Sequence, residues 1–501
     1  MADDISSPIR SVVIAGGGTA GWMAAAALAR HFGKAGVAFT LVESSDIGTI
    51  GVGEATIPTI RRFIAALGLS EAEVMRETEA TAKLGILFEG WDAPNGRFLH
   101  PFGMYGQDAG DIGFHHLWWR ARQQGDATPI DAYSLGAQLA RQGRMALPRT
   151  PAPTPLATYD WAFHLDAGRF AALLRRYAEA SGVTRIDAQI ATVERGDRGV
   201  AALHLHDGRR IAGDLFVDCT GFRSLLLGEA MAIGFEDWRQ WLPCDAAIAV
   251  QSEAGSGDPP PYTRAIAHGA GWRWQIPLRH RAGNGIVYAE GTLSEDEATA
   301  RLLADLPGKP LTEPRRIPFR SGRRTRAWAG NVVALGLAAG FLEPLESTSI
   351  ALIETGIERL RRLFPAGSDM AALADEFNDA TADEWERVRD FIILHYKLTG
   401  RRDTGFWRDC AAMDVPATLA RKLALWDARG EFVRYRWEMF HPSSWLALYA
   451  GFDRRPAALD PALAALPAEQ TAAAMARMRA GVAQAVAAAP GHADFLRSLD
   501  R

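Results

Sequence analysis

Residues 10–21 read Arg-Ser-Val-Val-Ile-Ala-Gly-Gly-Gly-Thr-Ala-Gly, a β-branched run that enters a glycine-rich turn. The alanine-rich segment that follows, residues 22–32, predicts a helix. Residues 37–42 (VAFTLV) predict a second strand, which ends at Glu43. Strand, glycine turn, helix and strand in this order predict the βαβ unit of a nucleotide-binding α/β fold.

The glycines of this turn follow the spacing G-x-G-x-x-G, which lets the backbone approach a pyrophosphate at a helix N-terminus. Glu43, at the end of the second strand, is placed to accept a hydrogen bond from a ribose hydroxyl. A structural glycine turn is the alternative, but strand, helix and acidic residue in register favour a bound dinucleotide. The predicted contacts are Gly16, Gly18, Thr19, Ala20, Gly21 and Glu43.

The rest of the chain alternates strands and helices up to residue 365, where Pro365 ends a predicted helix over 349–364. Beyond residue 370 the pattern is almost wholly helical. We therefore expect one α/β core over residues 8–365, with substrate-side inserts near 90–160 and 225–330. A helical C-terminal module, residues 366–501, is expected to pack on that core.

Composition excludes several classes of protein. The 501-residue chain has a net charge of −4, so nucleic acid is not an expected partner. Three scattered cysteines, no apolar run of membrane-spanning length and no signal-peptide pattern at the start predict a cytoplasmic protein. His204 and His206 alternate beside an Asp-Gly turn without a third ligand, so no metal site is expected.

The segment Trp272-Arg273-Trp274-Gln275-Ile276-Pro277, in a chain that opens with a dinucleotide fingerprint, resembles the flavin-dependent tryptophan halogenases. The stretches GVGEATIP at 51–58, GFLEPLEST at 340–348 and FIILHYKLTGRRDTGFW at 391–407 also resemble that family. The resemblance extends from residue 10 to residue 450. It implies a Rossmann-type FAD-binding core of the flavoprotein monooxygenase kind.

FAD is favoured over NAD because residues 214–221 and 331–350 resemble segments that surround the flavin in flavoprotein hydroxylases. Those hydroxylases place an aspartate after the glycine at position 336, whereas this chain has Leu337, which fits the halogenases better. The loop at 51–58 resembles the family's flavin strap. The additional FAD contacts that the resemblance implies are Gly53, Glu54, Ala55, Ile190 and Leu337.

Lys83 and Glu346 are the predicted catalytic residues. Lysine is rare in this chain, standing only at 34, 83, 309, 397 and 422, and the apolar neighbours of Lys83 would favour a neutral amine. The resemblance implies that Lys83 holds hypohalous acid by a hydrogen bond or as a haloamine. It also implies that Glu346 polarises this species and accepts the ring proton. The alternatives are a solvated surface lysine and a carboxylate at a helix N-terminus.

The resemblance also implies a halide site and a substrate side. A halide would contact the backbone at Thr348 and Ser349, where a hydroxyl of residue 347 or 348 is expected to cap the helix. His100 and Phe102 would position the substrate ring. Trp272 and Trp274, on one face of a strand, would separate substrate from flavin, although core packing is the alternative for these indoles.

The sequence thus predicts a halogenase that uses FADH2 from a separate flavin reductase, O2 and chloride or bromide on an electron-rich aromatic. Residues 432–440 (FVRYRWEMF) lack the tandem tyrosines with which tryptophan-selective members hold the amino acid, so indole or an indole-containing compound is favoured over free tryptophan. The rival functions are a flavin-dependent aromatic hydroxylase and a non-catalytic flavin-binding or carrier-docking protein. A homodimer is compatible with the sequence.

Overall fold

The computed structural model describes residues 8–48 and 53–500, which form two compact units. Each unit combines three separate segments of the chain. Unit 1 contains residues 1–79, 165–240 and 318–386, and unit 2 contains residues 80–164, 241–317 and 387–501. The predicted boundary at residue 365 divides the chain into two continuous parts. Each of the two units contains residues from both sides of that boundary, so the boundary stays a prediction.

A six-stranded sheet forms the centre of unit 1, and its first two strands are those predicted on either side of the glycine turn. β1 lies between β2 and β12 and pairs with both in parallel, as in a nucleotide-binding α/β fold. In spatial order the strands are β20 (Trp328–Ala329), β21 (Val332–Ala334), β12 (Leu215–Asp218), β1 (Ser11–Ala15), β2 (Ala38–Glu43) and β8 (Thr184–Asp187).

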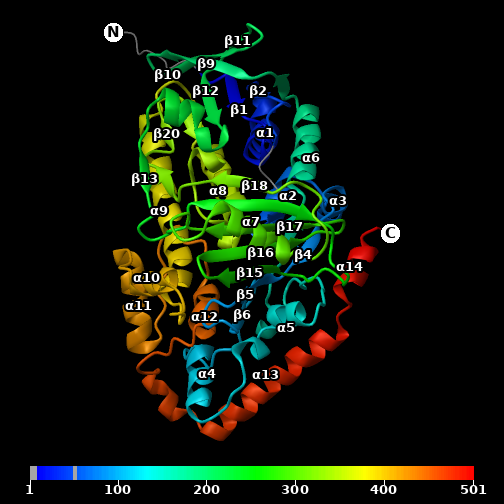
Figure 1. Ribbon diagram of the computed structural model, residues 1–501, viewed down its shortest axis with the longest axis vertical. Coiled ribbons are helices and arrows are strands. Elements are labelled where there is room, and N and C mark those ends of the chain that lie inside the picture. The colour runs from blue at the N-terminus through cyan, green and yellow to red at the C-terminus, as the bar shows by residue number, and fades with distance from the viewer. Residues whose placement is uncertain (1–7, 49–52, 501) are drawn as a thin grey trace. The chain divides into compact units, whose positions relative to one another are not determined.

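Helix α1 (Thr19–Phe32) packs against α6 (Ala167–Ala180) and α8 (Ser349–Arg362), as Figure 1 shows for α1 and α6. Small alanine side chains over positions 24–26 are fully buried, which allows this close helix packing. The other helices of this unit are α2 (Thr59–Leu67) and α3 (Glu71–Glu77). Its smaller sheets contain β9 (Ile190–Gly196), β10 (Gly199–Leu205), β11 (Arg210–Ala212), β13 (Phe235–Asp237), β19 (Gly322–Arg324) and β22 (Gly340–Phe341).

A seven-stranded, mainly antiparallel sheet forms the centre of unit 2, and the WRWQIP segment lies in its strand β16. Gly285 on β17 lies opposite Trp274 of β16 and, having no side chain, leaves room for that indole. In spatial order the strands are β18 (Arg315–Pro318), β14 (Ala246–Ser252), β17 (Ala282–Tyr288), β16 (Gly271–Pro277), β15 (Thr263–His268), β5 (Gly85–Glu89) and β6 (Arg97–Pro101).

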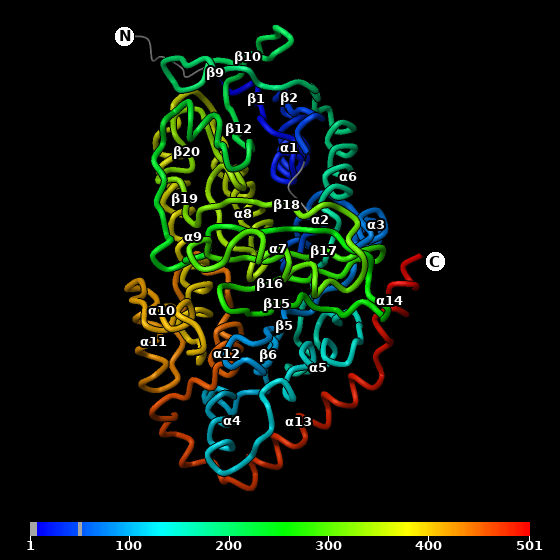
Figure 2. The backbone as a smooth tube through the Cα atoms, viewed as in Figure 1, coloured from blue at the N-terminus to red at the C-terminus, as the bar shows by residue number. Residues whose placement is uncertain are grey.

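A separate short pair in unit 2, β4 (Thr81–Lys83) with β7 (Ala162–Leu165), is antiparallel. α13 runs along α5 toward α14 at the C-terminal end (Figure 2). The helices of this unit are α4 (Phe114–Gln123), α5 (Leu135–Arg141), α7 (Glu295–Ala304), α10 (Gly405–Ala412), α11 (Ala417–Arg429), α12 (Pro442–Gly451), α13 (Ala468–Ala488) and α14 (His492–Ser498). α9 (Ala371–Lys397) begins within unit 1 and ends within unit 2.

The predicted elements are confirmed where periodicity was strong, and the C-terminal region is helical as expected. The segment 90–160, expected to be a substrate-side insert, contains β6, α4 and α5. In residues 8–48 and 53–500, none of the helices is long and apolar enough to span a membrane.

Candidate active site

Each glycine of the fingerprint in unit 1 meets a distinct steric requirement. Gly16 has φ +103°, and a Cβ there would lie 2.3 Å from the carbonyl oxygen of Cys219. A Cβ at Gly21 would lie 1.9 Å from the carbonyl oxygen of Gly16, so this glycine lets α1 pack closely on β1. Around Gly18 the described residues leave open space within 4 Å of a Cβ. A ligand can therefore approach the N-terminus of α1 at Gly18.

The first turn of α1 has the features of an anion site. Gly18 is the N-cap residue, and, lacking a side chain, it leaves the first N–H groups of Thr19 and Ala20 without a capping hydroxyl or carboxylate. Unpaired N–H groups and the helix dipole favour negative charge at this position. The turn therefore fits the pyrophosphate of a dinucleotide.

Glu43 lies at the end of β2, as predicted, and its carboxylate folds over the glycine turn. Its Oε2 atom would lie 1.5 Å from a Cβ at Gly17, while Oε1 accepts from Nε of Arg185 at 2.6 Å. The hydrogen bond to Glu43 raises the pKa of the Arg185 guanidinium. Arg185 escaped the sequence analysis because it lies on β8, about 140 residues away in the chain.

The other predicted FAD contacts are spread over unit 1. Leu337 lies in a 3-10 turn over Gly336–Ala338, and a Cβ at Gly336 would lie 2.9 Å from the Cβ of Ala20, so this turn packs on the start of α1. Ile190 is the first residue of β9. It follows by three residues the end of β8, whose last residue, Asp187, lies opposite Glu43 in the sheet. In the strap, residues 51 and 52 lie outside the described residues, whereas Glu54 and Ala55 form the short strand β3 (Glu54–Ala55).

The loop that resembles the family's halide site leads into α8. Residues Pro344–Glu346 form a 3-10 turn, in which Glu346 is 1% exposed, and Ser347 then takes a left-handed conformation with φ 60°. Thr348 is the N-cap residue of α8, but within the described chain its hydroxyl makes no capping hydrogen bond, so of the two hydroxyls expected to cap the helix, at 347 and 348, that of Thr348 does not. Ser349 is the first helical residue and does not need glycine's conformational freedom. The N–H groups of this first turn are therefore placed for an anion.

Further buried carboxyl groups of unit 1 were not singled out from the sequence. Glu343 is fully buried three residues before Glu346. Burial raises the pKa of Glu354, on α8, to about 8, and the neighbouring Thr59 hydroxyl acts weakly in the opposite direction. Packing around the carboxyl also raises the pKa of Glu54 to about 7, although part of that residue's surface remains accessible. Glu354 therefore favours its neutral form near pH 7.

In unit 2, Lys83 is the last residue of β4 and is 0% exposed, so it is not a surface lysine. Its Nζ atom lies 5.2 Å from the centroid of the Phe102 ring. Phe102 follows β6 and is half-buried, so part of this residue remains accessible. The structure thus places the predicted amine beside a predicted substrate-side aromatic residue.

A buried hydroxyl–imidazole chain lies beside Lys83. The Thr81 hydroxyl donates to the carbonyl oxygen of Pro277 at 2.7 Å, so at 2.8 Å it accepts from Nδ1 of His164. Nε2 of His164 then accepts from the Thr263 hydroxyl at 3.0 Å. Burial, followed by the charges of Lys83 and His492, lowers the pKa of His164 well below its usual value. This neutral chain, which the sequence analysis missed, fixes Thr81 two residues before Lys83.

His100 has an aromatic setting in unit 2. It is 1% exposed on β6, with its ring centroid 5.7 Å from that of Phe391 and 6.3 Å from that of Phe440. Phe391 and Phe440 stack at 3.7 Å. Only Phe102 of the predicted His100–Phe102 pair therefore keeps appreciable accessible surface.

Trp272 and Trp274 lie on β16 with their ring centroids 6.1 Å apart, which confirms that they share one face of a strand. Trp272 is buried and lies 6.5 Å from Trp91 in an aromatic cluster. Trp274 is half-buried and lies over Gly285, where a Cβ would come within 2.1 Å of the indole. Core packing therefore accounts for Trp272 more fully than for Trp274.

The segment 432–440 contains a buried ion pair. Nζ of Lys422, on α11, lies 2.8 Å from Oε1 of Glu438, and Oε2 of Glu438 accepts from the N–H of Tyr435 at 2.8 Å. Lys422 also lies over the rings of Tyr435 and Trp445, at 4.8 and 4.3 Å from their centroids. Both charged groups are thus engaged within the protein.

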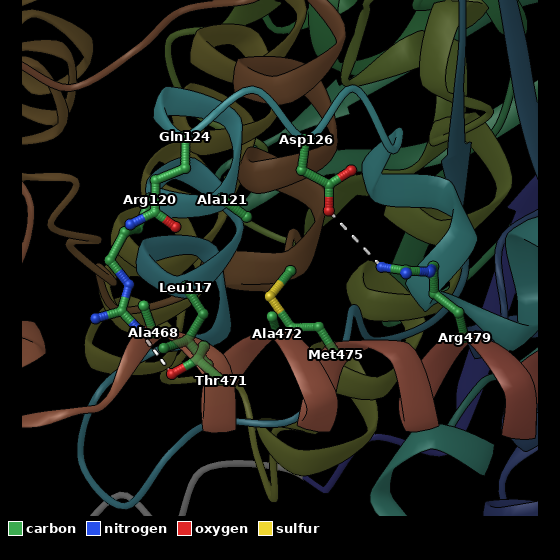
Figure 3. A pocket seen from close by; sticks show the side chains of 10 residues that line it. All are labelled: Leu117, Arg120, Ala121, Gln124, Asp126, Ala468, Thr471, Ala472, Met475 and Arg479. Carbon is green, nitrogen blue, oxygen red and sulfur yellow. Dashed lines mark hydrogen bonds and ion pairs between the residues drawn. The ribbon is translucent and has the colours of Figure 1, made fainter.

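A cavity of about 250 Å³ lies between α4 and α13, and its lining includes none of the predicted site residues (Figure 3). Its arginines are engaged, since Arg120 donates to the Thr471 hydroxyl at 2.6 Å and Arg479 lies 3.8 Å from Asp126. Within the described ranges, no cluster of three or more His, Cys, Asp or Glu side chains could hold a metal ion.

Comparison with known proteins gives a consistent result over nearly the whole chain. A family model described as tryptophan halogenase matches residues 11–468. BrvH, a flavin-dependent halogenase from Brevundimonas sp. BAL3, is 61% identical, and the match covers 98% of this chain and 99% of that chain with a TM-score of 0.95. Xcc4156, a flavin-dependent halogenase from Xanthomonas campestris, is 45% identical, with 98% of both chains covered and a TM-score of 0.94. Tryptophan 6-halogenase SttH from Streptomyces toxytricini is 37% identical over 482 residues, which cover 90% of this chain and 91% of that protein.

Proposed function

Because the chain belongs to the tryptophan halogenase family and is a flavin-dependent halogenase, we propose that it halogenates indole or an indole-containing compound. The observation that carries the proposal is the fully buried Lys83, whose amine lies 5.2 Å from the half-buried Phe102 ring. A lysine buried beside an accessible aromatic ring is suited to hold a reactive electrophile next to an aromatic substrate.

FAD is the cofactor of this family, and the open N-terminus of α1 at Gly18 fits its pyrophosphate. When bound in the reduced form, FAD supplies the electrons with which O2 converts chloride or bromide to hypohalous acid. Gly16 and Gly21 keep the turn compact, and Oε2 of Glu43 accepts from a ribose hydroxyl. The strap residues Gly53, Glu54 and Ala55, together with Ile190 and Leu337, complete the proposed contacts.

In the proposed reaction Lys83 holds the electrophilic halogen, and the ring carbon of the substrate attacks it. A carbon–halogen bond forms as the halogen–oxygen bond breaks, and the oxygen leaves as hydroxide. The carboxylate of Glu346 takes up the ring proton and passes it to that hydroxide, which becomes water. The N–H groups that begin α8, at Thr348 and Ser349, bind the halide. Phe102 stacks on the substrate, and Trp274 helps to separate the substrate from the flavin. His100 and Trp272 are buried and support these two side chains.

An indole substrate is supported by the ion pair between Lys422 and Glu438. A clamp for free tryptophan needs a carboxylate that receives the ammonium group, and Glu438 is engaged at 2.8 Å by Lys422. SttH is named for tryptophan, whereas BrvH and Xcc4156, at higher identity, are described only as flavin-dependent halogenases. The proposed substrate is therefore an electron-rich aromatic ring, which is bound without a clamp for the ammonium and carboxylate groups of an amino acid.

The partners and location are part of the same proposal. A separate flavin reductase supplies FADH2, since the only dinucleotide fingerprint found in the sequence is the one assigned to FAD. The buried thiols Cys219, Cys244 and Cys410 suit a reducing cytoplasm. A homodimer is compatible with this arrangement.

One incubation tests the proposal. The protein is mixed with FAD, a flavin reductase, NADH and either bromide or chloride, and a panel of indoles is examined by mass spectrometry. Products that carry halogen isotope patterns and require both halide and reductase are expected. Oxygenated products that form without halide would contradict halogenation and identify a hydroxylase instead.

A further inference from the structure

Strand β4, which carries Lys83, pairs along one edge only. In its antiparallel pairing with β7, Thr81 lies opposite His164, Ala82 opposite Phe163 and Lys83 opposite Ala162. β4 is the last strand of its small sheet, so the N–H of Ala82 points away from β7. A buried edge N–H needs another acceptor, because it has no access to water.

His492, the first residue of α14, supplies that acceptor. The N–H of Ala82 donates to Nε2 of His492 at 3.1 Å, and Nδ1 of the same ring lies 2.6 Å from the carbonyl oxygen of Pro259. A carbonyl only accepts, so Nδ1 carries the proton and Nε2 is the acceptor. The imidazole ring is 1% exposed, and both of its nitrogens are hydrogen-bonded in one neutral tautomer.

Several contacts hold α14 against this strand. The N–H of His492 donates to the carbonyl oxygen of Gly143 at 2.8 Å, and the N–H of Met145 donates to the carbonyl oxygen of Pro490 at 3.1 Å. Further along the helix, the Phe495 ring meets the edge of Trp161, with centroids 6.1 Å apart. The C-terminal helix is therefore anchored independently of the bond to Ala82.

The opposite side of β4 is held by the Thr81 hydroxyl, through Pro277 and His164. Thr81 and Ala82 are thus fixed from two directions, immediately before Lys83. Halogen transfer needs the amine in one place, since a displacement of about 1 Å can cost roughly a hundredfold in rate. His492 also lies beyond residue 468, where the match to the family model ends.

We infer that His492 is a positioning residue for Lys83, which accepts the Ala82 N–H and so couples the C-terminal helix to halogen transfer. This inference rests on the proposed role of Lys83. Without the imidazole acceptor, the N–H of Ala82 is left buried and unsatisfied, and β4 moves to find another partner. Lys83 then holds the electrophilic halogen less well, and more of the hypohalous acid leaves the site before it reacts with the substrate.

The test compares three variants of the full-length protein loaded with FAD. His492→Leu removes the acceptor, His492→Gln keeps a carbonyl oxygen to accept and an amide to donate, and Phe495→Leu loosens the packing of α14 without touching Ala82. Two quantities are measured: halogenated product per FADH2 oxidised, and hydrogen exchange of the Ala82 amide.

His492→Leu is expected to lower halogenated product per FADH2 about tenfold, with an unchanged KM for the indole, and to accelerate exchange of the Ala82 amide. In His492→Gln, the product yield and the exchange rate return at least halfway from their values in His492→Leu to those of the parent protein. Phe495→Leu leaves them within about twofold of the parent protein. If His492→Leu does not fold, His492→Ser is measured in its place, with the same expectation.

An unchanged exchange rate at Ala82 in His492→Leu would overturn the anchoring, and faster exchange with full product yield would overturn the link to Lys83. A parent protein that makes no halogenated product would instead contradict the proposed function and, with it, that link. The exchange rate of the Ala82 amide would still decide whether His492 anchors β4.

Discussion

The Nζ atom of Lys83 lies 5.2 Å from the centroid of the Phe102 ring, in the interior of unit 2. Lys83 is fully buried at the end of β4, whereas Phe102 is half-buried. The buried amine therefore lies beside a ring that the protein covers only in part, which is the arrangement that the proposed chemistry at Lys83 requires.

Lys83→Ala is expected to abolish halogenated product while FAD binding and hydrogen peroxide release persist, because flavin oxidation does not need the amine. Lys83→Arg should not restore product, since a guanidinium is bulkier and cannot lose its proton. Product is quantified by mass spectrometry, and peroxide by a coupled peroxidase assay. Normal product yield in Lys83→Ala would remove this residue from the mechanism.

Glu346→Gln is expected to lower turnover by about two to three orders of magnitude, the range for losing a general base or an electrostatic stabiliser. Glu343→Gln is the matched control, because Glu343 is equally buried in the same loop. We expect turnover within about threefold of the parent protein in the control, and similar melting temperatures in both variants. A less than threefold loss in Glu346→Gln would leave that residue a structural role only.

Gly18→Ala and Gly21→Ala should separate cofactor binding from folding. A Cβ at Gly18 meets open space, so the apoprotein should keep its stability while the Kd for FAD rises about tenfold through contact with the pyrophosphate. A Cβ at Gly21 would lie 1.9 Å from the carbonyl oxygen of Gly16, so this variant should lose about 1–3 kcal/mol of stability. Denaturant unfolding and FAD titration provide the measurements, and unchanged FAD affinity in Gly18→Ala would argue against pyrophosphate at this turn.

The fold of unit 1 was predictable because its signals are local. Periodicity and glycine spacing within residues 10–43 identified β1, α1 and β2, and a proline at 365 marked the end of the helix that begins at Ser349. The interleaving of two units from six segments was not predictable, since it depends on contacts between residues far apart in the chain.

The same limit applies to the candidate site. Lys83 stood out because lysine is rare here, but the residues that hold its strand, Thr81, His164 and His492, meet only through the fold. Arg185 beside Glu43 is likewise a long-range contact. The left-handed conformation of Ser347 and the missing hydroxyl cap at Thr348 are likewise not specified by the local sequence.

Glu354 should make stability fall with rising pH. Burial raises its folded pKa to about 8, above the usual value of 4.5, so between these values the folded state keeps a proton that the unfolded state has released. With respect to this group, stability is therefore highest below about pH 4.5 and decreases by up to about 1.4 kcal/mol per pH unit from there toward pH 8. Urea unfolding of Glu354→Gln at pH 5, 6, 7 and 8 should show a shallower slope than the parent protein, with Glu54 supplying part of the remainder. Parallel slopes would place the Glu354 pKa near its ordinary value.

Substrate choice depends on whether Glu438 is available to a ligand. Its carboxylate lies 2.8 Å from the ammonium group of Lys422 and also accepts the Tyr435 N–H, so an amino acid would have to displace a buried ion pair to bind there. Affinity should instead come from stacking on residues such as Phe102, and free tryptophan should gain little over plain indole. The kcat/KM values for indole and L-tryptophan, measured side by side, should agree within about tenfold. A hundredfold advantage for tryptophan, about 2.7 kcal/mol of transition-state binding, would show that an amino-acid clamp exists elsewhere in the protein.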